Sequence, residues 1–199
     1  AALAVAIVAS TALSACATSE PAPRSTPDAN KATATDAVVV AAHPLAVDAG
    51  IAVLRRGGSA IDAAVAVQAM LGLVEPQSSG LGGGAIILAY DAATGSVTSY
   101  VGRESAPALA TPRLLDDAEG NAIPLREAML TGRATGVPGA VAVFAAAQHD
   151  HGALRWDQLF DETIDQAEHG FRITPRLAQH IHGKFPQASA PDVTAYFSD

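Results

Sequence analysis

Residues 77–102, QSSGLGGGAIILAYDAATGSVTSYVG, decide the fold class of this chain. The apolar stretch over 85–90 and a second stretch over 96–101 predict two short strands. The turn between them contains a glycine, which is typical of an antiparallel hairpin. The glycine-rich segment 80–84 has two interpretations. It is either a turn that needs positive φ and a close backbone approach, or a set of backbone amides that line a ligand pocket.

The segment upstream of the hairpin predicts one strand and two helices. The β-branched run Val38–Ala42 is typical of a buried strand, and His43 is placed to cap the helix that follows it directly. Ser59 followed by Asp62 has the spacing of a capping box, which predicts a second helix over 60–74. Because that helix is apolar nearly all round, we expect it to be buried on several sides.

The segment downstream of the hairpin predicts mainly helices. We expect the chain to turn helical after 103–104, and we expect further helices from 136–139 to about 150, over 156–169 and from Thr174 or Pro175 onward. The order of a strand, two helices, a hairpin and several helices is typical of an α+β fold. In such a fold helices cover an antiparallel sheet, instead of alternating with parallel strands.

The first 36 residues predict a targeting signal and a tether. Residues 1–16 form an uncharged apolar run that is too short to span a membrane and ends in small residues. Leu13-Ser14-Ala15-Cys16 resembles the lipobox of bacterial lipoproteins, in which the cysteine is lipidated; the alternative is a chance cysteine in a signal core. Residues 17–36 are polar and Pro-rich, which predicts an extended linker before a globular part over 37–199. We therefore expect secretion across the inner membrane and a lipid-anchored protein in the periplasm.

The composition excludes several classes of function. Lys and Arg number 12 against 20 Asp and Glu, and the resulting net charge of −8 argues against nucleic-acid binding. One cysteine excludes an internal disulfide framework and a Cys-rich zinc module. The histidine pairs 149/151 and 180/182 point apart on a helix, so we expect no metal site, and no cofactor is implied. A GxSxG elbow and a complete nucleotide-binding glycine motif are both missing.

Arg103 is the strongest candidate for a ligand-binding residue. It closes the second predicted strand, in the stretch Tyr100-Val101-Gly102-Arg103-Glu104. A guanidinium can grip a carboxylate through two parallel N–H···O bonds, a geometry that lysine cannot copy. The alternative is a structural ion pair with Glu104 or another acid, and spacing alone favours that alternative.

Several blocks of the sequence together resemble the γ-glutamyltransferases. In the family's order they are Val40–Ala46, Leu54–Ala66, Gln77–Gly84, Arg103–Pro107 and Gly136–Gly139. The resemblance covers about Val38 to Phe171. It implies an N-terminal-nucleophile hydrolase fold, which is an αββα sandwich, and a precursor that cuts itself into a large and a small subunit.

The resemblance also implies roles for particular residues. In the family the arginine of the Arg-Glu block binds the α-carboxylate of the γ-glutamyl group, and that arginine is Arg103 here. The family's nucleophile is a threonine freed at the start of the small subunit, downstream of residue 199, so this chain is expected to hold no catalytic residue. We expect it to be an incomplete, N-terminal part of the large subunit. Two departures from the family's pattern are Ala85-Ile86, where a further glycine and a phenylalanine are usual, and Gly102, where a bulky residue is common.

The expected activity is transfer of the γ-glutamyl group of glutathione or a similar donor to water or an amino acid, through an acyl-threonine intermediate. The expected partners are the small subunit of the same precursor and a membrane. One alternative is an acylase that acts on glutaryl or cephalosporin side chains, with Arg103 on the distal carboxylate. Another is a lipid-anchored binding module that kept the fold and lost the chemistry. A threonine at a self-cleavage point downstream separates the enzymes from the binding module.

Overall fold

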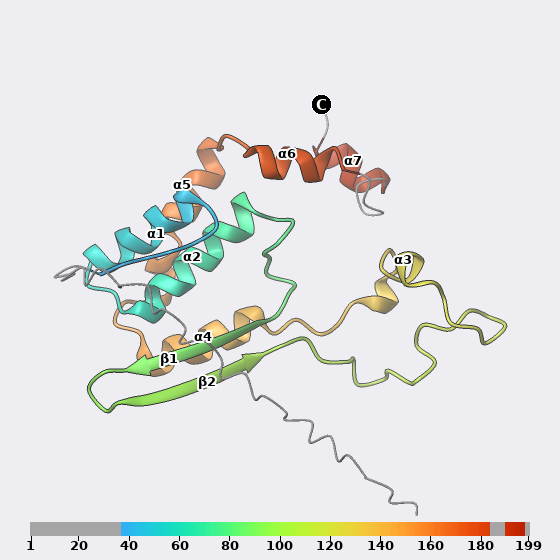
Figure 1. The fold of residues 1–199 in the computed structure, drawn as a ribbon, viewed down its shortest axis with the longest axis horizontal. Coiled ribbons are helices and arrows are strands. Elements are labelled where there is room, and N and C mark those ends of the chain that lie inside the picture. The colour runs from blue at the N-terminus through green and yellow to red at the C-terminus, as the bar shows by residue number, and fades with distance from the viewer. Residues whose placement is uncertain (1–36, 184–189, 198–199) are drawn as a thin grey trace, which may run out of the picture. The chain divides into compact units, whose positions relative to one another are not determined.

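The computed structural model of this chain describes residues 37–183 and 190–197. The predicted signal, Cys16 and the linker over 17–36 lie outside the described residues. The elements, of which the α-helices and strands are labelled in Figure 1, are α1 (Pro44–Arg55), α2 (Ala60–Val74), β1 (Ala85–Asp91), β2 (Ser96–Gly102), α3 (Leu125–Ala128), the 3-10 turn η1 (Gly132–Ala134), α4 (Ala140–His151), the 3-10 turn η2 (Trp156–Leu159), α5 (Asp161–His169), α6 (Pro175–Ile181) and α7 (Pro191–Phe197). The α+β class is therefore confirmed.

Helices α1 and α2 begin where the sequence predicts, and their caps explain why. The Nδ1 atom of His43 accepts a hydrogen bond from the Leu45 N–H at 3.1 Å, so His43 is the predicted N-cap. Ser59 and Asp62 form the predicted capping box: the Ser59 hydroxyl accepts from the Asp62 N–H, and the Asp62 carboxylate accepts from the Ser59 N–H. Each cap satisfies N–H groups that the first turn of a helix otherwise leaves unpaired.

The main core lies between α1 and α2, as the all-round apolar character of α2 predicts. Val53 from α1 and Val65, Met70 and Val74 from α2 are buried together with Leu159 of η2. Helix α2 also contacts α4 and α5, so it is covered on several sides. In the described ranges no helix is long and apolar enough to cross a membrane.

Asp62 ties this helix pair to the segment after α4. Its side chain is fully buried and accepts hydrogen bonds from the main-chain N–H groups of Ala153 (2.7 Å) and Leu154 (3.2 Å), and from the Gln148 amide (3.2 Å), in addition to its capping bond. Burial by itself raises the pKa of Asp62, but these bonds favour the ionised form, and together they lower its pKa below the ordinary value.

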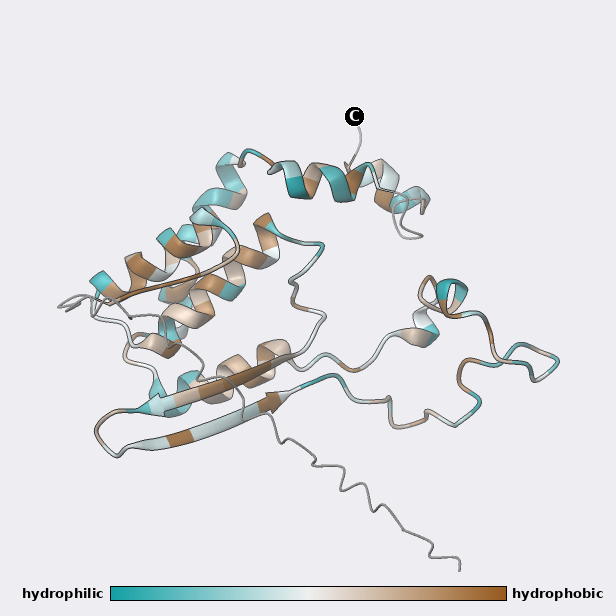
Figure 2. Ribbon diagram, in the orientation of Figure 1, coloured by the Kyte–Doolittle hydropathy of each residue, from teal (hydrophilic) through white to brown (hydrophobic). Residues whose placement is uncertain are grey.

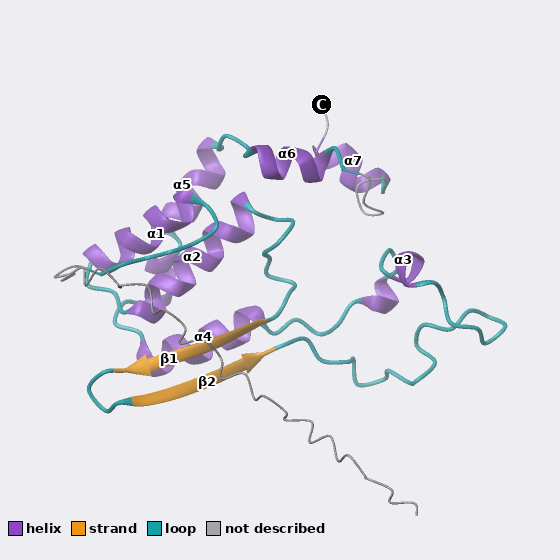
Figure 3. Cartoon of the chain, in the orientation of Figure 1, coloured by secondary structure: helices purple, strands orange, loops and turns teal. Residues whose placement is uncertain are grey.

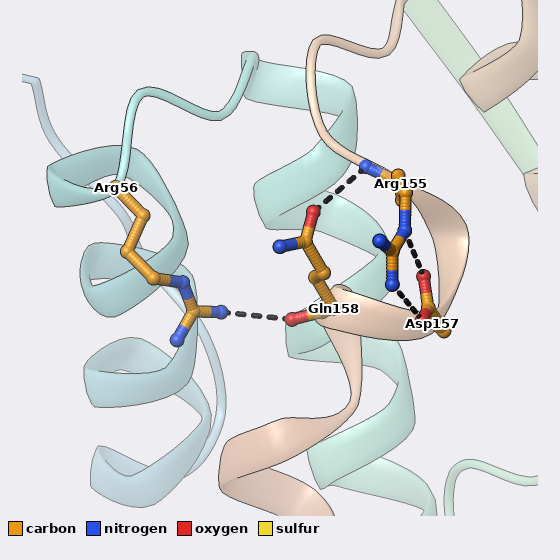
Figure 4. A network of polar contacts seen from close by, with 4 residues as sticks. All are labelled: Arg56, Arg155, Asp157 and Gln158. Carbon is orange, nitrogen blue, oxygen red and sulfur yellow. Dashed lines mark hydrogen bonds and ion pairs between the residues drawn. The ribbon is translucent and has the colours of Figure 1, made fainter.

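A second set of polar contacts joins the end of α1 to η2 and α5. The Arg56 guanidinium donates to the Gln158 carbonyl oxygen at 2.9 Å, and Arg155 pairs with Asp157 in the same turn (Figure 4). Arg56 also forms an ion pair with Glu162. Arg56 therefore contributes a cross-link between segments that lie 102 residues or more apart.

The hairpin forms as predicted and carries α4 on one face. Strands β1 and β2 pair antiparallel, with Ile87 opposite Tyr100 and Ala85 opposite Gly102. Ile87 packs with Val143 and Ala147 of α4 in a second buried cluster. The opposite face holds five large apolar side chains that are each at least 60% exposed (Figure 2 shows β1 as a largely hydrophobic strand): Ile86, Leu88, Tyr90, Val97 and Val101.

Three predictions about elements are wrong. Residues 38–42 form no strand, because the described part of the chain offers them no strand to pair with; Val40 is 88% exposed, while Val39 packs against Gly50. The chain does not turn helical directly after 103–104; it runs as a loop to α3 (Figure 3). Prolines at 107, 112 and 124 remove backbone donors along that loop. The helix expected over 156–169 divides at Phe160 into η2 and α5, and α7 was not expected.

Candidate functional site

The Arg-Glu block follows β2 directly, at the end of the hairpin where β1 begins. Because Gly102 pairs with Ala85, Arg103 and Glu104 leave the strand beside the last glycines of the loop over 80–84. A main-chain bridge between Ser105 and Val137 then joins this block to the segment before α4, through bonds of 2.8 and 3.3 Å. Three separate blocks of the sequence therefore meet at Glu104.

The glycine-rich loop provides room for Glu104. A Cβ atom on Gly84 would lie 2.7 Å from Glu104 Oε2 and 2.8 Å from the Gly102 carbonyl oxygen, so no larger residue fits. None of the glycines over 80–84 has positive φ, so the predicted need for positive φ in this loop is wrong, whereas the predicted close approach is confirmed. The Gly83 carbonyl oxygen accepts from the N–H groups of Gly139 (3.1 Å) and Ala140 (3.0 Å), which fixes the loop to the start of α4.

Gly102 is explained by its contact with α4. A Cβ atom there would lie 2.7 Å from both the Gly139 carbonyl oxygen and a methyl group of Val143. The space beside Gly102 is filled by Val143 and by main chain, so a side chain at this position would clash. This departure from the family's pattern is therefore a packing feature of the β2–α4 contact.

Arg103 forms the ion pair with Glu104 that the sequence left open as an alternative. One guanidinium nitrogen lies 3.1 Å from Glu104 Oε2, and the side chains of Arg103 and Glu104 are 63% and 30% exposed. An exposed pair of this kind contributes about 1 kcal/mol or less, since water screens it. Because a guanidinium has five N–H donors, one contact with Glu104 leaves donors accessible to a ligand carboxylate.

Two further features of the described residues are not predicted by the sequence. The first is Glu75 at the end of α2, a buried carboxylate that accepts from the Gln77 amide at 2.5 Å and lies 3.6 Å from Arg176 of α6. The second is an open cavity of about 530 Å³ beside Glu104, to which Arg133 contributes. Neither has a local signal in the sequence, because each depends on contacts between distant segments.

Two histidines of the described residues form structural contacts. His43 caps α1, and His151 lies 2.9 Å from the Tyr100 hydroxyl, which also donates to Asp150 at 2.7 Å. The bond to Asp150 raises the pKa of Tyr100. Within residues 37–183 and 190–197 no group of three or more His, Cys, Asp or Glu is placed to hold a metal ion.

Comparison with known proteins identifies the family. The sequence profile of the family described as gamma-glutamyltranspeptidase matches residues 46–199. The chain belongs to this family. It is 43% identical over 161 residues to the glutathione hydrolase proenzyme of Bacillus subtilis strain 168, a match that covers 79% of this chain and 27% of that protein.

Solved structures agree with this assignment. The gamma-glutamyltranspeptidase of Helicobacter pylori superposes with a TM-score of 0.74 at 34% identity, over 82% of this chain and 46% of that one. The cephalosporin acylase of Bacillus halodurans superposes less well, with a TM-score of 0.59 at 28% identity, over 79% of this chain and 27% of that one. The chain spans about a quarter of the length of the Bacillus subtilis relative and about half of the Helicobacter pylori chain.

Proposed function

We propose that the protein containing this chain moves the γ-glutamyl group of glutathione-like donors to water or to an amino acid. The family match over 46–199 supports the reaction class. The observation that carries the proposal for this chain is the exposed guanidinium of Arg103 at the end of β2, held on one side by Glu104. In this proposal Arg103 binds the α-carboxylate of the γ-glutamyl group.

The geometry around Arg103 suits that role. A guanidinium and a carboxylate form a planar, two-bonded pair, which fixes the orientation of the bound group as well as holding its charge. The Glu104 carboxylate lies against Gly84 and holds one guanidinium nitrogen of Arg103 at 3.1 Å. A donor bound in this way presents its γ-carbonyl carbon at a defined distance from the Arg103 fork.

The chemistry is supplied by a threonine downstream of residue 199. Its hydroxyl oxygen bonds to the γ-carbonyl carbon, and the carbon–nitrogen bond to the rest of the donor breaks, while the hydroxyl proton passes to the departing amine. Water or the amine of an amino acid then cleaves the resulting ester and returns the proton to the threonine. The residues described here bind and orient the donor; they do not exchange protons with it.

The chain takes the place of an N-terminal, incomplete part of a large subunit in an αββα sandwich. The exposed apolar face of the hairpin supports this placement, since a sheet face of five large apolar side chains is stabilised by a second sheet packed against it. The small subunit of the same precursor is the partner we propose for the completed sandwich. An unprocessed single band of full-length protein on a denaturing gel contradicts this arrangement.

The protein is held in the periplasm by lipid on Cys16. This part of the proposal rests on the sequence of residues 1–16 and on the polar linker after them. Metabolic labelling with a fatty acid is expected to tag the wild type and to leave the Cys16→Ala variant untagged, because the variant lacks the thiol that is acylated. Equal labelling of the two proteins contradicts lipidation at this position.

The deciding experiment compares two chromogenic substrates on the full-length protein. A γ-glutamyl anilide has the α-carboxylate and the α-amine, whereas a glutaryl anilide lacks the amine and its carboxylate ends the chain. Preferred hydrolysis of the γ-glutamyl anilide supports the transferase. Preferred hydrolysis of the glutaryl anilide supports the acylase, which the lower similarity to the Bacillus halodurans structure makes the second candidate. Turnover of neither substrate favours the binding module.

A further inference from the structure

The cavity beside Glu104 is built by hydrogen bonds between four segments. It is lined by Gly82 of the glycine-rich loop, by residues 104–107, by Leu114 and Leu115, and by residues 133–136, and its volume is about 530 Å³. The Ser105–Val137 bridge joins the 104–107 segment to the end of the 133–136 segment. On another side the Arg133 guanidinium donates to the Asp116 carbonyl oxygen at 2.8 Å, which ties the 133–136 segment to the 114–116 segment.

One of the two charged residues at this cavity lacks an ion-pair partner among the described residues. Two charged residues line it, Glu104 and Arg133. Glu104 is paired with Arg103, whereas Arg133 has no acidic partner in the part of the chain that the structure describes. Its single hydrogen bond, to a neutral carbonyl oxygen, leaves several N–H donors of the Arg133 guanidinium unused. An uncompensated arginine beside a cavity is noteworthy in a chain whose net charge is −8.

The remaining lining is compatible with a small peptide. Leu114, Leu115, Ala106 and Pro107 present aliphatic surface, and Ser105 adds a hydroxyl group. A site with an apolar wall and one cation at its edge suits a short aliphatic or thiol-bearing segment that ends in a negative charge. A carboxylate is the group that matches the planar fork of arginine.

We propose that this cavity binds the far end of the donor, and that Arg133 pairs with its terminal carboxylate. The substrate class is then a γ-glutamyl peptide with a free C-terminal carboxylate, gripped by Arg103 at the glutamyl end and by Arg133 at the other. This rests on the proposed function, since it assigns a second contact for the same donor. Glu104 lines the same cavity as Arg133 and is paired with Arg103, so it connects the two proposed binding positions.

The experiment measures discrimination between two donors by the full-length enzyme. The donors are glutathione and glutathione with its C-terminal carboxylate converted to an amide; a γ-glutamyl anilide, which has no such carboxylate, is the third substrate. The test variant is Arg133→Gln, and the matched control is Arg126→Gln. Arg126 is an exposed arginine seven residues earlier that does not line the cavity. Loss of one charge-assisted pair corresponds to about a tenfold change.

The expected result is a KM for glutathione raised about tenfold in Arg133→Gln, with the KM values for the amide and the anilide unchanged. Arg126→Gln is expected to match the wild type on all three. Two results overturn the proposal. An equal rise in KM for all three donors would show that Arg133 acts only through its bond to Asp116, and an unchanged KM for all three would show that Arg133 does not bind the donor. If no donor turns over, the proposed function fails, and the same comparison is made by calorimetric Kd for glutathione and its amide. A preference for glutathione that Arg133→Gln abolishes then still supports the subsite, and the absence of that preference refutes it.

Discussion

Replacing Asp62 with asparagine tests whether one buried carboxylate holds the helix pair to the segment after α4. The Oδ2 atom accepts three main-chain bonds, from Ser59 (2.8 Å), Ala153 (2.7 Å) and Leu154 (3.2 Å), and Oδ1 accepts from the Gln148 amide. Asparagine keeps one acceptor oxygen, so its NH₂ group must face another donor. The three main-chain N–H groups then donate to a neutral amide oxygen instead of a charged carboxylate oxygen. We expect a loss of about 3 kcal/mol in the free energy of unfolding.

The lowered pKa of Asp62 also predicts how the loss of stability changes with pH. The pKa of Asp62 is lowered in the folded state, so its contribution is complete above the unfolded-state value of about 4 and is lost as the pH falls through the lowered value. The stability difference between the wild type and Asp62→Asn is therefore expected to be largest at neutral pH and to shrink below about pH 4. Denaturant unfolding of the full-length protein at several pH values measures it.

The control is Asp48→Asn, which changes an exposed carboxylate on α1 and is expected to alter stability by less than about 0.5 kcal/mol. Hydrogen exchange gives a local readout, since the amides of Ala153 and Leu154 should lose protection in Asp62→Asn. An Asp62→Asn variant as stable as the control, or a difference that does not change with pH, refutes the reasoning.

Three further predictions concern the site and the hairpin. Arg103→Lys is expected to raise the KM for γ-glutamyl donors about tenfold or more, since lysine cannot form the two-bonded pair, and to leave self-cleavage intact. An unchanged KM would show that Arg103 does not bind the donor carboxylate. Gly84→Ala is expected to cost about 1–3 kcal/mol and to raise the donor KM as well, because its methyl group displaces Glu104, and normal kinetics would contradict that coupling. Residues 37–199 expressed alone are expected to aggregate, because the outer face and both edges of the hairpin are uncovered in the described residues; a cooperative, monomeric thermal transition would disprove this.

The features that the sequence predicts well are local. The capping residues His43 and Ser59 act within three positions of themselves, so spacing alone determines where α1 and α2 begin. The hairpin likewise depends on neighbouring stretches joined by a short turn. The resemblance to the γ-glutamyltransferases supplied the family, which the profile match confirms, while the role of Arg103 stays a prediction.

The features that the sequence misses depend on distant partners. The β-branched run over 38–42 has strand character, yet a strand exists only where another strand accepts its hydrogen bonds. The glycine-rich loop predicts a close approach but not its partner, which is Glu104, 20 positions after Gly84. The cavity beside Arg133 is formed by four segments, and no single one of them carries a pattern for it.

The contact between Gly102 and Gly139 has a mechanical consequence. Main chain touches main chain there, with the Gly102 carbonyl carbon 2.7 Å from where a Gly139 side chain would begin, and no flexible side chain lies between the two. Because no side chain there can rearrange, a small displacement of α4 moves the main chain of Gly102 and of Arg103, which follows it. The position from which the Arg103 side chain leaves β2 is thus coupled to the rigid-body position of a helix, and under the proposed role of Arg103, mutations that tilt α4 are expected to change donor affinity without touching the donor.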